Sequence, residues 1–152
     1  MKTYEPGERF EQMLGFDYSA IGEGVWHTMG WEVVQLDPGS ATLEWKTNTD
    51  HAFPSGDGWI VHGGLVATVL DTAMGQATMT LLDNDEVFLT ADLHTEFYRP
   101  TVPGTLRAKA RVVHKTKRLT YAAAELLDLE DTVLAAGRVT NVTLEARKRN
   151  DA

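Results

Sequence analysis

The longest regular pattern in the sequence runs from Gly64 to about Leu82 and predicts a helix. At 100° per residue, one broad arc carries the apolar side chains Val66, Val69, Leu70, Ala73, Met74, Ala77 and Leu81. The opposite side carries small residues and threonines, with one exception, Asp71. Such a helix is expected to be surrounded by protein. Asp71 would then be a lone charge on a largely buried helix, which is energetically costly and requires an explanation.

Alternating apolar and polar positions predict strands on both sides of this helix. The predicted strands cover residues 25–36, 41–47, 88–97, 106–114, 121–129 and 133–144. The turn Asp37-Pro38-Gly39-Ser40 joins the first two into a hairpin. A short helix is expected over residues 6–14, after Pro6, and a loop over residues 50–59, which are rich in proline and glycine.

Within residues 88–97 the alternation predicts a two-faced strand. One face would carry Leu89, Ala91, Leu93 and Phe97, and the other Thr90, Asp92, His94 and Glu96. A hairpin, one long helix and four further strands indicate an α+β domain with one sheet packed on one helix. The 152 residues contain no linker or internal repeat, so we expect a single domain over residues 1–152 with its core at about 25–145.

Composition narrows the possible chemistry. The sequence is 43% apolar and 24% charged, as in a soluble globular protein, and it lacks cysteine, which excludes disulfides, thiolate catalysis and cysteine-ligated metals. It contains no G-x-S-x-G or H-E-x-x-H motif, so we expect neither a metal nor a redox cofactor. The charged start, broken by Pro6 and Gly7, is not expected to be a signal peptide. We expect a cytoplasmic protein without a membrane span.

Charge is distributed unevenly along the chain. A net charge of −8 argues against nonspecific nucleic-acid binding, yet residues 107–118 hold six of the fourteen basic residues and no acid. Basic residues alternating on a strand are typical of a solvated face, or of a sheet edge protected against pairing with another strand. Lys115, Lys117 and Arg118 lie at the predicted turn that follows and are candidates for binding substrate phosphates.

The most specific motif is Val61-His62-Gly63-Gly64, followed by Asp71 on the predicted helix. Two glycines at a helix start allow a ligand to approach the backbone closely. Their N–H groups, aided by the helix dipole, can hold the oxyanion that develops on a thioester carbonyl. A carboxylate can activate water or attack the carbonyl itself. The plainer interpretation of Asp71 is a buried aspartate hydrogen-bonded to Thr68 or to a neighbouring backbone group.

The segment VHGGLVATVLDTAMG resembles the H-G-G…D signature of hotdog acyl-CoA thioesterases of the phenylacetate-degradation (PaaI) type. The later segment TADLHTEFYRPTVPG resembles the family's strand and Arg-Pro turn, so the resemblance covers about residues 25–145. It implies a hotdog fold, in which a mainly antiparallel sheet of about five to six strands wraps one long central helix. It also implies hydrolysis of an acyl-CoA thioester to a free acid and coenzyme A, with coenzyme A as part of the substrate and no separate cofactor.

The resemblance assigns roles to individual residues. Gly63 supplies the oxyanion N–H, and Asp71 is the general base or nucleophile. Thr90 matches a strand serine or threonine that helps to place the attacking water. His62 and Gly64 shape the loop and the start of the helix.

One position departs from the family pattern. Many members carry an asparagine six residues before the histidine, and here that position is Gly56. Ser55 and Asp57 are candidate replacements, and the nearest asparagine is Asn48. The departure leaves open a noncatalytic acyl-CoA binding module. A hotdog hydratase or dehydratase is the other alternative, although those enzymes use a histidine–carboxylate pair in a different local pattern.

The spacing of Gly63 and Asp71 bears on oligomeric state. Eight residues of one helix separate them by roughly 12 Å, whereas both groups must lie about 3 Å from one reacting centre. Either they serve different sites, or Gly63 of one chain faces Asp71 of another. The second alternative predicts an obligate dimer with two sites at its interface, and the family commonly pairs such dimers into tetramers. The acyl pocket would draw on residues such as Leu70, Met74 and Phe53 from two chains.

Overall fold

The structure is a computed structural model, and it describes residues 2–147. The helical elements are α1 (Phe10–Leu14), η1 (Tyr18–Ala20), α2 (Gly24–Met29), η2 (Thr49–His51) and α3 (Gly63–Met79). The strands are β1 (Glu32–Asp37), β2 (Ser40–Lys46), β3 (Ala52–Ser55), β4 (Gly58–Val61), β5 (Glu86–Phe97), β6 (Thr105–Lys115), β7 (Leu119–Leu127) and β8 (Val133–Glu145).

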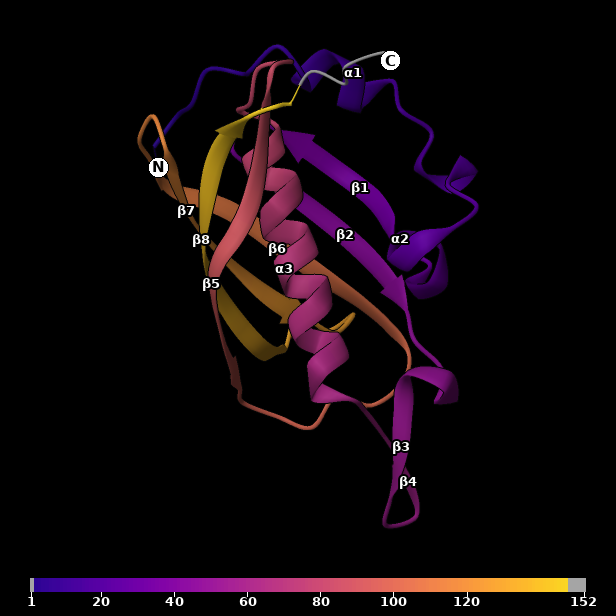
Figure 1. The fold of residues 1–152 in the computed structure, drawn as a ribbon. Coiled ribbons are helices and arrows are strands. Elements are labelled where there is room, and N and C mark those ends of the chain that lie inside the picture. Colours follow the sequence, from indigo (N-terminus) through magenta and orange to yellow (C-terminus); the bar gives the residue numbers. More distant parts are fainter. Residues whose placement is uncertain (1, 148–152) are drawn as a thin grey trace.

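One long helix and one curved sheet form the body of the molecule. The sheet has six strands in the order β1-β2-β6-β7-β8-β5, and every neighbouring pair is antiparallel. Figure 1 shows the sheet curving around α3, with the separate β3–β4 ribbon projecting beyond the start of that helix. The α+β hotdog fold predicted from the sequence is confirmed.

The apolar arc of α3 forms the centre of the core. Val66, Val69, Leu70, Ala73, Met74 and Ala77 are at most 1% exposed. They face inner positions of the sheet such as Leu43, Trp45, Ala108 and Leu126, which are fully buried. Burying these side chains is the main favourable contribution to folding, at about 1.5–3 kcal/mol for each large one. The sheet thereby fixes which side of α3 is left for other contacts.

The predicted strand over residues 25–36 is wrong in its first half. Residues 24–29 form α2, and Gly30, at φ +68°, ends that helix with its N–H donating to the Trp26 carbonyl. Trp26 packs against the rings of Tyr18 and Trp31, at centroid distances of 5.0 and 5.5 Å. These aromatic contacts outweigh the local preference of Val25 and Trp26 for a strand, because strand propensity depends on tertiary packing.

The predicted loop over residues 50–59 is also corrected. It contains η2 and the β3–β4 ribbon, whose turn places Gly56 at φ +58°, a conformation that favours glycine. Pro54 is tolerated because β3 pairs with a single partner strand and belongs to no larger sheet. The family asparagine position therefore falls on a tight turn.

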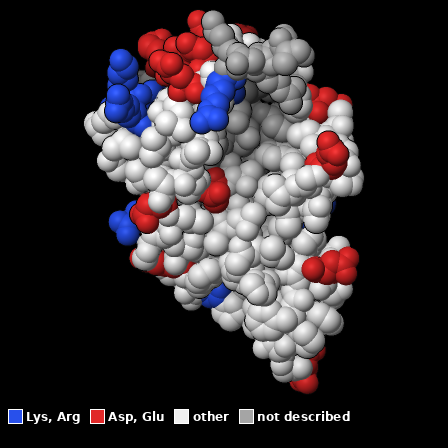
Figure 2. Space-filling model, in the orientation of Figure 1, with Lys and Arg blue, Asp and Glu red and all other residues white. Residues whose placement is uncertain are grey.

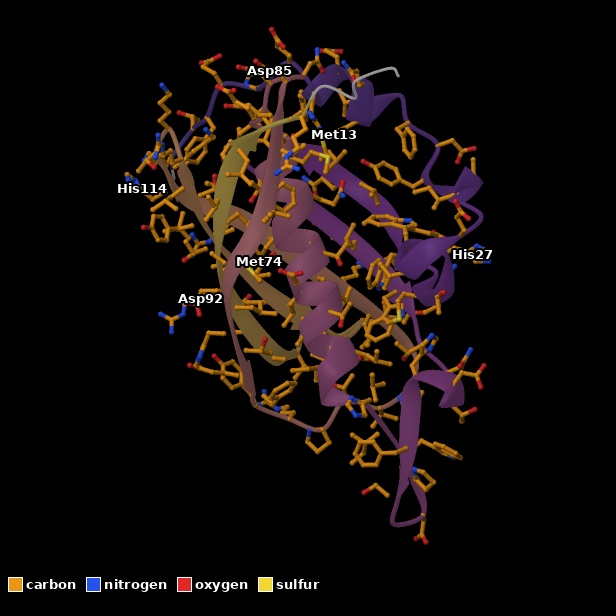
Figure 3. All side chains as sticks on the ribbon, viewed as in Figure 1. Met13, His27, Met74, Asp85, Asp92 and His114 are labelled. Atoms are coloured by element: carbon orange, nitrogen blue, oxygen red, sulfur yellow. The ribbon has the colours of Figure 1, made fainter. Side chains whose placement is uncertain are left out.

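A β-bulge changes which residues of β5 face the helix. Thr90 pairs with Asn141 and Asp92 with Thr140, so Ala91 is an extra residue in the ladder. Thr90 consequently faces α3, whereas Asp92 lies on the side of β5 away from the helix (Figure 3). The predicted common face for Thr90, Asp92, His94 and Glu96 is thus wrong, since the bulge shifts the two-residue period by one.

Strands β6 to β8 follow the predicted pattern. In β6 the inner positions Leu106, Ala108, Ala110 and Val112 are buried, and Arg107, Lys109 and Arg111 alternate with them on the outer face. Arg107 lies 3.4 Å from the carboxylate of Glu44. Among residues 2–147, no helix is long and apolar enough to cross a membrane.

Candidate active site

The start of α3 presents one backbone N–H group without a partner in the described chain. His62 is the N-cap residue, and its Nδ1 accepts a hydrogen bond from the Gly64 N–H at 3.0 Å. The N–H groups of Leu65 and Val66 both donate to the His62 carbonyl. Among residues 2–147, no acceptor binds the Gly63 N–H, which points outward from the positive end of the helix dipole. This group can hold a developing oxyanion.

Gly63 lines an open pocket of about 330 Å³. A side chain at Gly63 would place its Cβ 3.3 Å from the ring of Phe97, so the absence of a side chain keeps the backbone accessible beside that ring. The pocket is lined mainly by apolar groups, among them Phe53, Ile60, Val66 and Phe97. A carbonyl bound at Gly63 would lie next to this surface.

Asp71 is the single charged residue of α3 and is half-buried. The Thr90 hydroxyl donates to its Oδ1 at 3.0 Å. Burial raises the pKa of the Asp71 carboxyl above its ordinary value, and the Thr90 hydrogen bond partly opposes that rise. Thr68 instead donates to the Gly64 carbonyl, so the interpretation of Asp71 as a partner of Thr68 is wrong.

The structure brings Asp71 and Thr90 together, and Gly63 together with His62 and Gly64, but it keeps the two groups apart. Helix α3 is uninterrupted from Gly63 to Met79. The rise per residue therefore separates Gly63 from Asp71 by roughly 12 Å along the axis. One protomer thus presents an oxyanion donor and a carboxylate at two separate points of the same helix.

Asn141, which is not among the residues predicted from the sequence, lies beside Thr90 on the neighbouring strand β8. Asn141 is fully buried, its Oδ1 lies 3.3 Å from the Thr90 hydroxyl, and its Nδ2 donates to Thr78 on α3. The signal was present in the alternation of β8, where Val139, Asn141 and Thr143 take the inner positions. An asparagine in that phase is a polar residue at a position that should be buried.

Several predicted binding residues lie away from Asp71 and Gly63. Ser55 and Asp57 flank Gly56 at the tip of the β3–β4 ribbon, the end farthest from Gly63. Asn48 is engaged as the N-cap of η2, where it accepts from the Asp50 N–H at 2.8 Å. No asparagine of this segment is therefore free to replace the family residue.

The basic turn, Lys115, Lys117 and Arg118, joins β6 to β7 at one end of the sheet. Lys115 pairs with Thr120, Thr120 with Asn141, and Asn141 with Thr90, so three strand spacings, about 14 Å, separate Lys115 from Thr90. Lys117 and Arg118 are exposed. The turn makes no contact with Asp71 in the protomer.

Leu70 and Met74, which were expected in the acyl pocket, belong to the core instead. Both are fully buried, and Met74 points from α3 toward Gly137 on β8 (Figure 3). They are four residues apart and so share one face of the helix, the face that packs against Gly137 of the sheet. Phe53 does line the pocket beside Gly63. Among residues 2–147, no group of three or more His, Cys, Asp or Glu side chains is placed to hold a metal ion.

Replacing Asp71 by asparagine is expected to raise the free energy of unfolding at neutral pH. Because the folded-state pKa is raised, the contribution of Asp71 to stability is fully present below the unfolded pKa and is lost as pH rises through the folded pKa. Asparagine carries no charge at any pH, so the advantage of the variant should grow across that window. Thermal unfolding at a series of pH values measures it, and a variant less stable than wild type at neutral pH would contradict the burial argument.

Comparisons with known proteins show what this chain is similar to. The sequence pattern of the Thioesterase superfamily matches residues 59–142, from β4 through α3 to β8. A candidate esterase of Saccharolobus solfataricus is 31% identical over 97 residues, which are 64% of this chain. The match spans only 62% of the length of that relative.

Two solved structures show the same fold. A thioesterase of Haemophilus influenzae superimposes with a TM-score of 0.79 at 15% identity, over 98% of this chain and 96% of that one. The PaaI protein of the Escherichia coli phenylacetic acid degradation operon gives 0.72 at 21% identity, over 90% and 91% of the two chains. Because the superfamily pattern covers more than half of the sequence, the chain belongs to the Thioesterase superfamily.

Proposed function

We propose that the protein is an acyl-CoA thioesterase of the PaaI type, with its active site between two subunits. The observation that carries the proposal is the pairing of two features on one helix. Asp71 is a half-buried carboxylate with a raised pKa, held by Thr90, and Gly63 presents an N–H without an acceptor in the described chain. A base and an oxyanion donor are the two groups that thioester hydrolysis requires.

In the general-base route, the thioester carbonyl accepts the Gly63 N–H, and Asp71 takes a proton from water. The water oxygen then bonds to the carbonyl carbon, and the resulting oxyanion is held by Gly63. When the oxyanion collapses, the carbon–sulfur bond breaks, and the coenzyme A thiolate leaves and takes up the proton from Asp71. In the alternative route, an Asp71 oxygen bonds to the carbonyl carbon, the carbon–sulfur bond breaks, and the coenzyme A thiolate leaves. Water then hydrolyses the resulting anhydride, which returns the Asp71 carboxylate, releases the acid and supplies the proton that the thiolate takes up. A raised pKa makes Asp71 a stronger base in the first route.

The unpaired edge of β5 supports a dimer. This strand has twelve residues and ends the sheet, so one row of its backbone N–H and C=O groups has no strand partner within the described part of the chain. Leu89, Leu93 and Phe97 on β5 are 62%, 39% and 54% exposed. A long apolar edge strand pairs readily with another chain. Two copies joined along β5 by a twofold axis would set their α3 helices antiparallel, with Gly63 of one level with Asp71 of the other.

Charge on the helix side of the molecule supports the same arrangement. Figure 2 shows that Lys, Arg, Asp and Glu gather at the margins of this face, while its middle carries mostly uncharged residues. The outward side of α3 is accordingly made of small residues and threonines, with Asp71 as its single charge. An uncharged face of this kind favours contact with protein, in a dimer or in a pair of dimers.

The pocket beside Gly63 supports an apolar acyl group. Its volume of about 330 Å³ and its lining by Phe53, Ile60, Val66 and Phe97 suit an aliphatic or aryl chain. The coenzyme A part would extend outward, and the basic turn, Lys115, Lys117 and Arg118, is the proposed contact for its phosphates. Exposed cations near a flexible phosphate chain contribute modestly to affinity and mainly assist association.

Thiol release from acyl-CoA substrates tests the proposal. Acetyl-, medium-chain, long-chain and aryl-acyl-CoA are incubated with the protein and a thiol-reactive dye. Because the protein has no cysteine, every thiol detected is product. We expect cleavage of the apolar acyl substrates. The position of Gly56 on a turn favours a noncatalytic binding module as second candidate, and calorimetric binding without any thiol release would establish it.

A further inference from the structure

We propose that Asn141 is a positioning residue that competes with Asp71 for the hydroxyl proton of Thr90, and so keeps the Asp71 carboxylate basic. The inference rests on the proposed role of Asp71 in thioester hydrolysis. It concerns a buried residue on β8 that is paired with Thr90 of β5. Its basis is the count of donors and acceptors around one threonine hydroxyl.

The Asn141 amide is held in one orientation from the helix side. Its Nδ2 donates to Thr78 Oγ1 at 2.9 Å, and the Thr78 hydroxyl itself donates to the Met74 carbonyl at 2.9 Å. Thr78 can therefore only accept from Asn141, so the amide oxygen is turned toward Thr90. Asn141 and Thr78 are both fully buried, which makes loss of a hydrogen bond there costly.

Thr90 has one hydroxyl proton and two acceptors within reach. Asp71 Oδ1 lies at 3.0 Å and Asn141 Oδ1 at 3.3 Å. When Asp71 is ionised, it accepts the hydrogen bond from the Thr90 hydroxyl, and the buried Asn141 oxygen is left without a donor. When Asp71 is protonated, its own O–H donates to Thr90 Oγ1, and the Thr90 hydroxyl turns to donate to Asn141. Both Thr90 Oγ1 and Asn141 Oδ1 then accept a hydrogen bond. Asn141 thus favours the protonated form of Asp71.

This arrangement fits the proton transfer of the general-base route. As Asp71 takes a proton from water, the Thr90 hydroxyl no longer has to donate to Asp71. It can turn and donate its hydrogen bond to Asn141 instead. The chain from Asp71 through Thr90 to Asn141 therefore changes from one hydrogen bond to two at the moment of proton uptake. Without Asn141, the Thr90 hydrogen bond would stabilise the ionised carboxylate and weaken it as a base.

Among residues 2–147, no other charged group of the neighbouring elements contacts Asp71. Helix α3 carries no second charge, and Glu86 at the start of β5 accepts from the Asp83 N–H. The remaining charged or titratable residues of β5 and β8 are Asp92, His94, Glu96 and Arg138, which line pockets on the outer face of the sheet, and Glu145 at the end of β8. The pKa of the Asp71 carboxyl therefore depends on its burial and on its hydrogen bond with Thr90.

The experiment is an NMR titration of the Asp71 carboxyl in ¹³C-labelled protein, with the signal assigned by its loss in D71N. Asn141→Leu removes the competing acceptor at similar volume and should lower the pKa of Asp71. Thr90→Val removes the donor and should raise it. In the double variant, Asn141→Leu should have no further effect on Asp71, because its action passes through Thr90. Asn141→Ala serves the same purpose if the leucine variant does not fold.

Thr120→Val is the matched control. Thr120 pairs with Asn141 from β7, is equally buried, and its hydroxyl has no partner among the described residues. It should leave the pKa of Asp71 unchanged. An unchanged or raised pKa in Asn141→Leu would overturn the proposal, as would an equal shift in Thr120→Val. An Asn141 amide turned the other way, with Nδ2 on Thr90, would produce the upward shift.

The titration needs no substrate, so it separates this proposal from the proposed function. If acyl-CoA is cleaved, Asn141→Leu should also lower kcat about threefold to tenfold and move the acidic limb of the pH profile to lower pH, with KM little changed. If acyl-CoA is not cleaved but the titration behaves as described, the proposed function fails and the coupling stands.

Discussion

Asp71→Asn is expected to lower kcat for acyl-CoA hydrolysis at least a hundredfold. Asparagine keeps the shape of the side chain and can still accept the Thr90 hydrogen bond, but it can neither take a proton from water nor attack a carbonyl. A positioned general base contributes about 10²–10⁴-fold, so the loss should fall in that range. KM should change little, since the lost interaction belongs to the chemical step. Thiol release measured on both proteins gives the ratio.

Asp92→Asn is the matched control for that prediction. Asp92 lies two residues beyond Thr90 on β5, and the bulge turns it to the outer face of the sheet. It should retain nearly wild-type activity. Should the Asp71 variant cleave substrate as fast as wild type, or should the Asp92 variant lose as much, Asp71 would not be the reacting carboxylate.

Gly63→Pro is expected to lower kcat about 10²–10³-fold, as deletion of one oxyanion donor does elsewhere. Proline removes the Gly63 N–H and adds a Cβ that lies 3.3 Å from the Phe97 ring. The first position of a helix accepts proline well, and His62, at φ −59° and ψ 128°, already has the extended conformation that a residue before proline prefers. Thiol release and thermal unfolding together measure the effect, because the variant should be folded and nearly inactive.

Gly63→Ala separates loss of the donor from crowding of the pocket. Alanine places the same Cβ 3.3 Å from the Phe97 ring but keeps the N–H. It should lose much less activity than proline, and mostly through KM. Equal losses in the two variants would show that space beside Phe97, and not the N–H, is what Gly63 provides.

The helix and the order of elements could be predicted because their signals are local. The apolar arc of α3 and the alternation in β6 follow directly from the periods of helix and strand. The bulge at Ala91 could not be predicted in this way, because it is set by the pairing of β5 with β8 and leaves no local mark. Helix α2 was missed for a related reason, since contacts of Trp26 with Tyr18 and Trp31 decide its conformation.

The relative placement of the candidate residues could be predicted where one motif carries the geometry. The glycines, the N-cap histidine and Asp71 lie in one segment, so their placement on a single helix followed from spacing. Thr90 was proposed by resemblance, and its hydrogen bond to Asp71 depends on the bulge. Asn141 lies seventy residues beyond Asp71, and only the strand register reveals that it lies beside Thr90. Sequence periodicity does not predict hydrogen bonds between side chains on different strands, because these depend on strand register.

Subunit complementation tests the shared active site most directly. The two inactive variants, Asp71→Asn and Gly63→Pro, are co-expressed with different affinity tags, and mixed oligomers are purified through both. If each site combines Gly63 of one subunit with Asp71 of its partner, the mixed dimer has one intact site and should regain roughly half of the wild-type thiol release. If both groups act within one chain, every site in the mixture carries a lesion. Mixed oligomers as inactive as their parents would contradict the account.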